Sequence, residues 1–235
     1  MLPKIAAPTF ELTQPSTGKT IQYRPFLVKE EKSLLIARES GERKDVFNAV
    51  KQIINACVIT EGFDVNQIPL FDMEYIFINL RAKSVNNIVE FQVEDSTDGK
   101  TYDLSVDLDE VQVVFPERHD NKVQISDKIG LVMKHPTPEI SDKIANLETV
   151  AEITYQTMMS CIDYVYDEEE TYPWSQSSDK ERKEFLDNLP IEAYNKIQKF
   201  FETVPKIEHI VTYENSEGVE KKVVFRNLED FFTLY

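Results

Sequence analysis

The residues that could do chemistry are concentrated between positions 89 and 111, in the stretch VEFQVEDSTDGKTYDLSVDLDEV. Such a run of carboxylates could bind calcium, supply catalytic acids, or form the outer face of a hairpin. A calcium loop of the EF-hand type requires Gly at position 6 and a bidentate carboxylate at position 12. With Gly99 at position 6, position 12 is Ser105, which has no carboxylate. The spacing therefore argues against a calcium loop.

Catalytic carboxylates are also disfavoured by the pattern of this stretch. Asp103 and Asp107 alternate with Tyr102, Leu104 and Val106. Successive side chains of a strand point to opposite faces, so we expect the acids to face water and the apolar residues to face inward. A general acid needs surroundings that perturb its pKa. The stretch is therefore predicted to be a hairpin with a solvated acidic face.

The remaining motifs give no sign of an enzyme. The histidines are His119, His135 and His209, and no two of them have the helical spacing of metal ligands. The sequence has no CxxC pair, no serine in a nucleophile elbow and no glycine-rich phosphate loop. We therefore predict no catalytic residue, no metal ligand and no cofactor, and we expect that the chain is not an enzyme. An acid-dependent hydrolase is the least favoured alternative.

A second acidic segment, DEEE at 167–170, is followed closely by Tyr172 and by the single tryptophan, Trp174. One interpretation is a solvated loop whose Trp packs into the core. The other is a docking patch, with Trp174 as the anchor and the acids steering a basic partner. The closing segment adds further aromatic candidates, although Phe231 and Phe232 could equally belong to the core. The predicted partner-binding residues are Asp167, Glu168, Glu169, Glu170, Tyr172, Trp174, Phe231, Phe232 and Tyr235.

Helical periodicity covers much of the chain. Residues 26–41 and 42–59 are predicted helices, and the second has a clean apolar stripe from Val46 to Cys57. Residues 68–84 are apolar nearly all round, which is typical of a central helix, although a buried strand is the alternative for 75–80. Helical spacing returns after residue 139, with a stripe from Val150 to Val165, followed by two short helices within 177–205.

Strand signals separate these helical stretches. Hairpins are predicted at 10–26, at 89–108 around Asp98-Gly99, and near the C-terminus around NSEG at 215–218. Segments 110–115 and 121–136 add strands. Because strands and helices segregate along the chain, the predicted class is α+β, a helical core with two β-hairpin or small-sheet insertions. We expect segments at 1–87, 88–137 and 138–235, with the last forming one compact domain with the first.

Charge and composition restrict the partners. The chain has 42 acidic and 26 basic residues and a formal net charge of −16, so its field repels nucleic acids and anionic membranes. No apolar run reaches the length of a signal peptide core or a membrane span. Cys57 and Cys161 occupy apolar positions of helical patterns, which predicts buried thiols of a cytoplasmic protein.

Several longer phrases resemble one phage family. They are residues 1–37 (MLPKIAAPTFELTQPSTGKTIQYRPFLVKEEKSLLIA), 71–85 (FDMEYIFINLRAKSV), 128–139 (KIGLVMKHPTPE) and 223–232 (VVFRNLEDFF). Together they are similar to the T-even-type bacteriophage baseplate hub assembly proteins, which are hub subunits or hub assembly catalysts. The resemblance covers residues 3–232.

The chain departs from part of that family in its hairpins. The resemblance implies that some relatives carry paired cysteines there, as in a zinc ribbon. Here the corresponding segments, 93–103 and 213–223, contain no cysteine, and a four-thiolate site needs those ligands. Zinc is therefore expected to be absent. The Asp-Gly turn, cross-strand pairs and packing must hold the hairpins instead.

The resemblance implies a role in assembly. The leading hypothesis is a non-enzymatic, chaperone-like factor that binds baseplate hub or tape-measure proteins in the host cytoplasm during contractile tail assembly. By binding one state of a client it would mask surfaces that otherwise associate too early. The alternative is a permanent structural subunit of the hub, found in the virion baseplate.

Overall fold

The chain folds into two compact units in a computed structural model that describes residues 6–232. Unit 1 comprises the described residues up to Val114 and from Lys206 onward, and unit 2 comprises Phe115–Pro205. Helices and small antiparallel sheets occur in both units, which confirms the α+β class. The unit boundaries fall at 114/115 and 205/206, whereas the sequence pattern suggested boundaries at 87/88 and 137/138.

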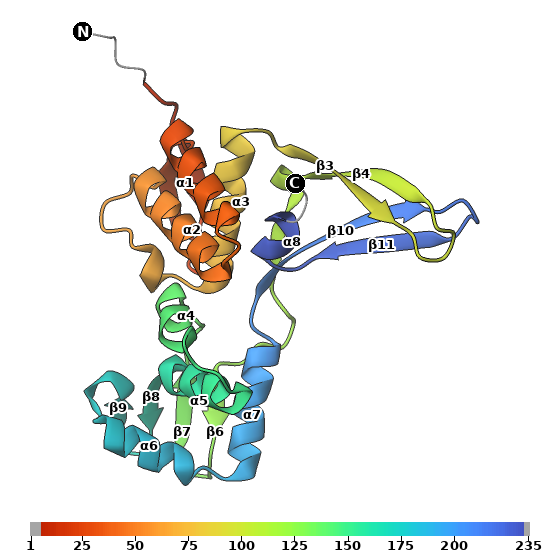
Figure 1. Cartoon of the computed structure of the whole chain (residues 1–235). Coiled ribbons are helices and arrows are strands. Elements are labelled where there is room, and N and C mark those ends of the chain that lie inside the picture. The colour runs from red at the N-terminus through yellow and green to blue at the C-terminus, as the bar shows by residue number, and fades with distance from the viewer. Residues whose placement is uncertain (1–5, 233–235) are drawn as a thin grey trace. The chain divides into compact units, whose positions relative to one another are not determined.

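Unit 1 is built around three helices, α1 (Val28–Glu39), α2 (Arg43–Cys57) and α3 (Leu70–Ser84), with short turns η1 (Val65–Gln67) and η2 (Leu108–Glu110) (Figure 1). The predicted stripe of α2 is confirmed, since its buried residues are Ala49, Val50, Ile53, Ile54 and Cys57. Helix α3 is confirmed over the strand alternative, and both sides of it are buried. Pro69 caps its start, where a missing N–H costs nothing.

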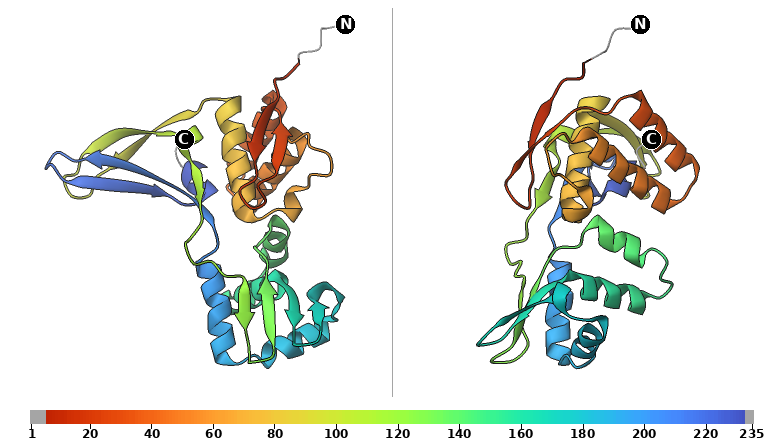
Figure 2. Two further views of the ribbon diagram at one scale, coloured as in Figure 1. Left: turned by 180° about the vertical axis from the view of Figure 1, so that it is seen from behind. Right: turned by 90° about the vertical axis from the view of Figure 1, so that its left-hand side faces the viewer.

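Three antiparallel β-hairpins complete unit 1, and the third is extended by one further strand. Strands β1 (Phe10–Thr13) and β2 (Thr20–Tyr23) form the first hairpin, which lies against the helices (Figure 2). Strands β3 (Ile88–Glu94) and β4 (Thr101–Asp107) form the second. Strands β10 (Lys206–Glu214) and β11 (Glu220–Phe225) form the third, and β5 (Gln112–Val114) pairs with the other edge of β10. The last helix, α8 (Leu228–Phe232), follows β11.

One hydrophobic core joins these elements of unit 1. It contains α2 and α3 together with inward-facing residues of the hairpins, such as Ile21, Val89 and Ile207. A buried carboxylate ties the first hairpin to α3: Asp72 is fully buried and accepts hydrogen bonds from Gln14 Nε2 (3.3 Å), the Ser16 amide (3.0 Å) and the Ser16 hydroxyl. A buried charge requires such partners, so this turn is fixed to the helix by polar contacts as well as by packing.

Unit 2 combines a four-stranded antiparallel sheet with four helices. The strand order is β6 (Lys122–Gln124), β7 (Gly130–Met133), β8 (Ile162–Tyr166) and β9 (Thr171–Pro173). The helices are α4 (Pro138–Ile144), α5 (Val150–Cys161), α6 (Asp179–Asp187) and α7 (Ile191–Glu202), and the turn η3 (Trp174–Gln176) follows β9.

The predicted helical stripe from Val150 to Val165 was wrong at its last two positions, Ile162 and Val165. Helix α5 ends at Cys161, and Ile162 begins strand β8, which pairs with β7. The segment IDYVY is β-branched and aromatic, which suits a strand, and Val150 at the other end is 79% exposed. Ser178 and Glu181 form a capping box at the start of α6.

Unit 2 has its own core, formed by residues of the sheet, of α5 and of α7, including Leu131, Ile162 and Ile197. Both cysteines are free and buried, Cys57 in the first core and Cys161 in the second, as predicted. Within residues 6–232, none of the helices is at once long enough and apolar enough to cross a bilayer.

Candidate functional site

The β3–β4 hairpin largely has the predicted faces. Val89 and Phe91 are buried, whereas Glu90 and Glu94 are exposed. The pairing runs from Ile88 opposite Asp107 to Glu94 opposite Thr101 without a register shift. Most acidic residues of 89–111 therefore face solvent, as the alternation of polar and apolar residues predicted.

Two carboxylates in the turn of this hairpin behave differently from that prediction. Asp95 is only 4% exposed, and Asp98 is half-buried. The Asp95 carboxylate accepts hydrogen bonds from its own turn, at the Thr97 amide (2.8 Å), and from the other hairpin, at Tyr213 Oη (3.2 Å) and Asn215 Nδ2 (3.3 Å). The expectation that every acid of the run faces water was therefore wrong at the turn.

Asp98 completes a polar junction between the β3–β4 and β10–β11 tips, which lie side by side in Figures 1 and 2. Its Oδ2 accepts from the amide (3.1 Å) and hydroxyl (2.7 Å) of Ser216 and from the Tyr102 hydroxyl (2.5 Å). The Tyr102 hydrogen bond is the main reason that the pKa of Asp98 lies well below its ordinary value. Lys221 from β11 donates to Thr97 Oγ1 (2.6 Å) and lies 3.9 Å from Asp95 Oδ1.

The carboxylates of this junction do not have the raised pKa of a general acid. Each carboxylate is held ionised by donors of its own chain: the Thr97 amide contributes most to the lowered pKa of Asp95. A general acid would need the opposite shift. No group of three or more His, Cys, Asp or Glu side chains suited to a metal ion occurs in the described part of the chain. Carboxylate, amide and hydroxyl hydrogen bonds thus connect the two tips.

Two of the three histidines meet in unit 2, which their spacing in sequence did not predict. His119 Nε2 lies 3.0 Å from His135 Nε2, and His119 Nδ1 lies 3.0 Å from Thr203 Oγ1. The Thr203 hydroxyl donates to the carbonyls of Lys199 and Phe200, so it accepts from His119 Nδ1–H. His119 Nε2 is then the acceptor and His135 Nε2–H the donor, which requires the His119 ring to be neutral. Burial lowers the pKa of His135 to about 4.

The acidic segment 167–170 forms the tight turn between β8 and β9. Asp167 Oδ1 accepts the amides of Glu169 (2.9 Å) and Glu170 (2.8 Å), and Asp167 Oδ2 accepts the Tyr172 hydroxyl (2.9 Å). These amides, that of Glu170 foremost, lower the pKa of Asp167. Glu168 pairs with Lys128 at 3.0 Å. Asp167 therefore shapes the turn, and its three glutamates project from it.

Beside this turn lies a cavity of about 300 Å³ between the sheet and α6. Trp174, Val165 and Phe185 supply apolar walls, and Ile129 and Tyr172 stand at its edge, 40% and 44% exposed. The Trp174 ring is 6% exposed, donates its N–H to the Met159 carbonyl (2.7 Å) and meets the edge of Phe185. Trp174 is therefore part of the unit 2 core and one wall of the cavity.

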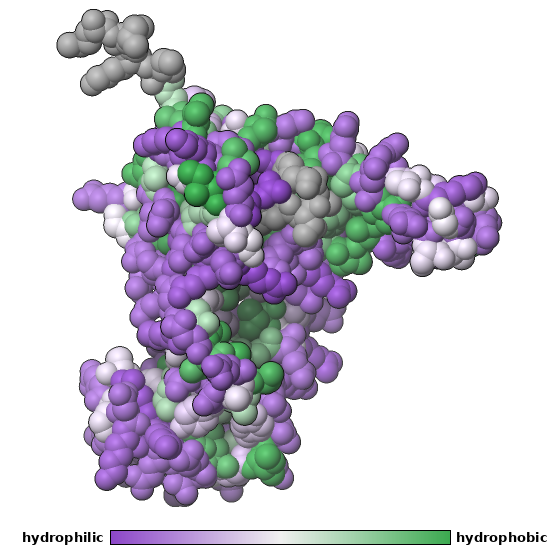
Figure 3. All heavy atoms as spheres, in the orientation of Figure 1, coloured by the Kyte–Doolittle hydropathy of each residue, from purple (hydrophilic) through white to green (hydrophobic). Residues whose placement is uncertain are grey.

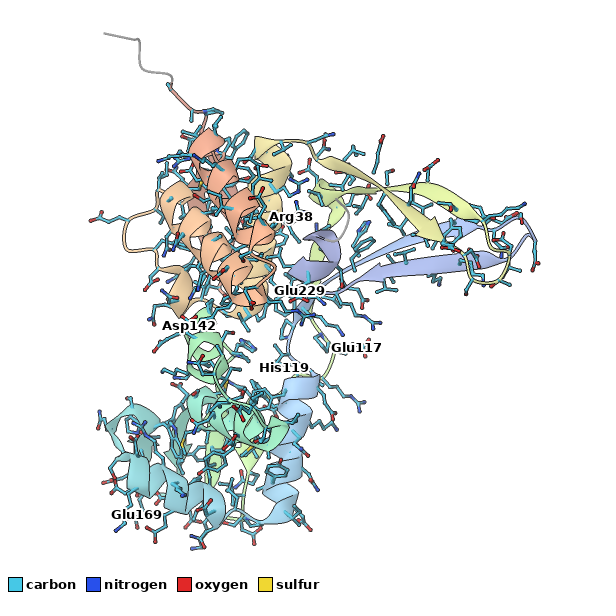
Figure 4. All side chains as sticks on the ribbon, in the orientation of Figure 1. Arg38, Glu117, His119, Asp142, Glu169 and Glu229 are labelled. Atoms are coloured by element: carbon cyan, nitrogen blue, oxygen red, sulfur yellow. The ribbon has the colours of Figure 1, made fainter. Side chains whose placement is uncertain are left out.

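The structure places the predicted partner-binding residues in both units, some of them exposed and some buried. Glu168, Glu169, Glu170 and Tyr172 are exposed together on one turn, and Figure 4 shows Glu169 at the periphery of unit 2. Trp174 lies just beneath them and is buried, as the core interpretation supposed.

The aromatic candidates of the last segment lie elsewhere, in unit 1. Phe231 is 5% exposed and packs on Phe225 in the unit 1 core. This agrees with the alternative that Phe231 is a core residue. Phe232 ends α8, and Tyr235 lies outside the described residues. Binding of a partner by any of these residues stays a prediction.

Some lining residues escaped the sequence interpretation. Ile129, Val165 and Phe185 come from the β6–β7 turn, from β8 and from α6, and they meet only because β8 lies in the sheet beside β7. The signal that could have found Val165 is the β-rich composition of IDYVY, which was interpreted as the end of a helix. Arg182, also at the cavity, is held by the Trp174 carbonyl (2.9 Å) and the Ser175 carbonyl (3.2 Å).

Comparison with protein families matches residues 7–233 to the family described as T4 bacteriophage base plate protein. A comparison with curated proteins and one with solved structures each found no match. The family match spans both structural units and all four phrases that suggested a phage baseplate protein, apart from the first six residues. The chain therefore belongs to the T4-type bacteriophage base plate protein family.

Proposed function

We propose that this chain is a non-enzymatic assembly factor of the contractile tail, which binds baseplate hub or tape-measure proteins in the host cytoplasm and leaves before the virion is complete. The observation that carries the proposal is the family match over residues 7–233. The side-chain chemistry supports it. The carboxylates that gather in one place, Asp95 and Asp98, have lowered pKa values and hold two hairpins together.

The mechanism would be differential binding. A protein that binds one conformation of a client shifts the population toward that conformation by its difference in affinity for the two states. The strongly negative surface favours clients with basic segments and disfavours nucleic acid. Hydrophilic side chains cover the part of unit 2 near β9 and α6 (Figure 3), and Glu168, Glu169 and Glu170 on the β8–β9 turn are exposed. Such exposed acids suit early, charge-steered encounters with such a client.

The experiment that tests this proposal is quantitative mass spectrometry of purified virions and of tail intermediates from infected cells. An assembly factor should be present in early intermediates and absent from virions. A fixed number of copies in every virion would overturn the escort role and would establish the alternative, a permanent hub subunit. Intermediates that never contain the chain would refute both roles.

A further inference from the structure

We propose that the cavity beside the β8–β9 turn binds a short segment of a partner protein in which one large apolar side chain is flanked by Lys or Arg. This inference rests on the proposed function, because it names the chemistry of the client that the chain would recognise. The apolar side chain enters the cavity and packs against Val165 and the Trp174–Phe185 ring pair, and the flanking cations face Glu169 and Glu170.

The apolar part of this recognition follows from the walls of the cavity. Val165, Trp174 and Phe185 form apolar walls of the cavity, and Ile129 and Tyr172 form a partly exposed rim. A volume of about 300 Å³ lies at the small end of ligand pockets. It suits one bulky side chain rather than a helix or a strand. Burial of such a side chain in a preformed pocket is the usual anchor of a protein interface.

The polar groups at the cavity explain why a small polar ligand fits poorly. Asp167 is occupied by two amides and by the Tyr172 hydroxyl. Glu181 accepts the amide (2.8 Å) and hydroxyl (2.6 Å) of Ser178 at the start of α6. The Arg182 guanidinium is bound to backbone carbonyls. A small molecule needs convergent free donors and acceptors, and these groups are already paired within the chain.

The charge around the cavity selects a cationic neighbour for the apolar anchor. Asp167 and Glu181 line the cavity, and Asp167 is shared with an adjoining depression lined by Glu168, Glu169 and Glu170. Arg182 also lines the cavity, and Lys128 is paired with Glu168. The Glu169 and Glu170 carboxylates form no ion pair or side-chain hydrogen bond with any residue in 6–232. They are therefore available to Lys or Arg of a partner, and an acidic partner would be repelled.

The test uses the full chain and a set of overlapping 15-residue peptides that cover the hub and tape-measure proteins of the same phage. Trp174 is the only tryptophan and forms a wall of the cavity, so its fluorescence reports occupancy directly. Binding peptides should share a large apolar residue next to Lys or Arg. Replacing that apolar residue by Ala, or the cations by Gln, should weaken binding about tenfold or more, and 0.5 M salt should weaken it further.

Variants of the chain complete the test. The double substitution Glu169→Lys and Glu170→Lys should reduce affinity about tenfold without moving the unfolding midpoint, because both side chains are exposed. The matched control, Glu61→Lys with Glu110→Lys, changes net charge equally in unit 1 and should leave binding unchanged. Ile129→Ala should also weaken binding, since it removes part of the apolar rim.

The outcomes separate this inference from the proposed function. It is overturned if no peptide changes Trp174 fluorescence, if acidic peptides bind as well as basic ones, or if the Glu169 and Glu170 substitutions have no effect. None of these results bears on whether the chain leaves the virion. Conversely, finding the chain in every virion would refute the escort role, but it would not contradict peptide binding at the cavity.

Discussion

The carboxyl of Glu74 is expected to make the stability of unit 1 depend on pH. It lies on α3 and its carboxylate accepts the Leu228 amide at the start of α8 (3.4 Å). Burial foremost, together with the nearby Asp230 and Glu229, raises the pKa of Glu74 to about 7, against the lowering effect of the Leu228 amide. In the unfolded chain a glutamate has a pKa near 4.5. The folded protein therefore keeps a proton on Glu74 that the unfolded chain has already lost.

The sign of the pH effect follows from this difference. Between about pH 4.5 and 7 the folded state binds more protons than the unfolded state, so the free energy of unfolding falls as pH rises. At about 1.4 kcal/mol per pH unit, the full difference corresponds to about 3 kcal/mol. The Glu74 side chain is partly exposed, so water reduces this value, and we expect a loss of roughly 1–3 kcal/mol that is complete above pH 7.

The substitution Glu74→Gln removes the titration while keeping an oxygen for the Leu228 amide. The variant and the wild type should have equal stability near pH 4, and the variant should be roughly 1–3 kcal/mol more stable at pH 8. Urea unfolding followed by circular dichroism measures the total, and hydrogen exchange of peptides from 70–84 localises it to α3. Glu110→Gln, which removes one exposed charge elsewhere in unit 1, controls for net charge. Parallel stability curves for wild type and Glu74→Gln from pH 4.5 to 8 would refute the reasoning.

Three further predictions concern other buried polar groups. The His135 pKa of about 4 lies below the ordinary 6.5, so unit 2 should lose about 3 kcal/mol as pH falls from 6.5 to 4, and His135→Asn should flatten this loss in urea titrations followed by Trp174 fluorescence. Asp72→Ala should lower the free energy of unfolding by roughly 2–4 kcal/mol in thermal or urea unfolding, because the donors of the first hairpin, Gln14 and Ser16, lose their acceptor. Asp98→Ala should speed hydrogen exchange at both hairpin tips, including the Ser216 amide, and leave exchange in α3 unchanged; protection that persists at Ser216 would contradict the junction.

Local periodicity accounts for the parts of the fold that the sequence predicted well. The stripe of α2, the apolar surround of α3 and the Asp98-Gly99 turn each depend on residues within about one element of each other. Such signals act at short range, so a single sequence contains them. The boundary between α5 and β8 was missed because Ile162 and Val165 continue the spacing of the helix while also suiting a strand. Pairing with β7, a tertiary contact, decides between the two.

The candidate site could be predicted only in outline, for a related reason. Sequence showed the acids at 167–170 and an aromatic pair next to them, but it could not tell whether Trp174 points outward or inward. The distinction depends on the Met159 carbonyl, on Phe185 and on the cavity they leave. His119 and His135 likewise meet through loops rather than along one helix. Contacts of this kind leave no spacing that can be recognised in advance.

The placement of the carboxylates links the fold to the proposed role. In a chain with a net charge of −16, the carboxylates of Asp98 and Asp167 at two turns accept hydrogen bonds from amides and hydroxyls of the same chain. Such groups have their charge stabilised by fixed donors of the same chain, so they have little attraction left for a partner. Glu169 and Glu170 differ, because the turn that Asp167 holds presents them to water beside an open apolar cavity. In the proposed docking, the turn fixes where Glu169 and Glu170 lie, so binding would depend on the position of a partner's cations as well as on its net charge.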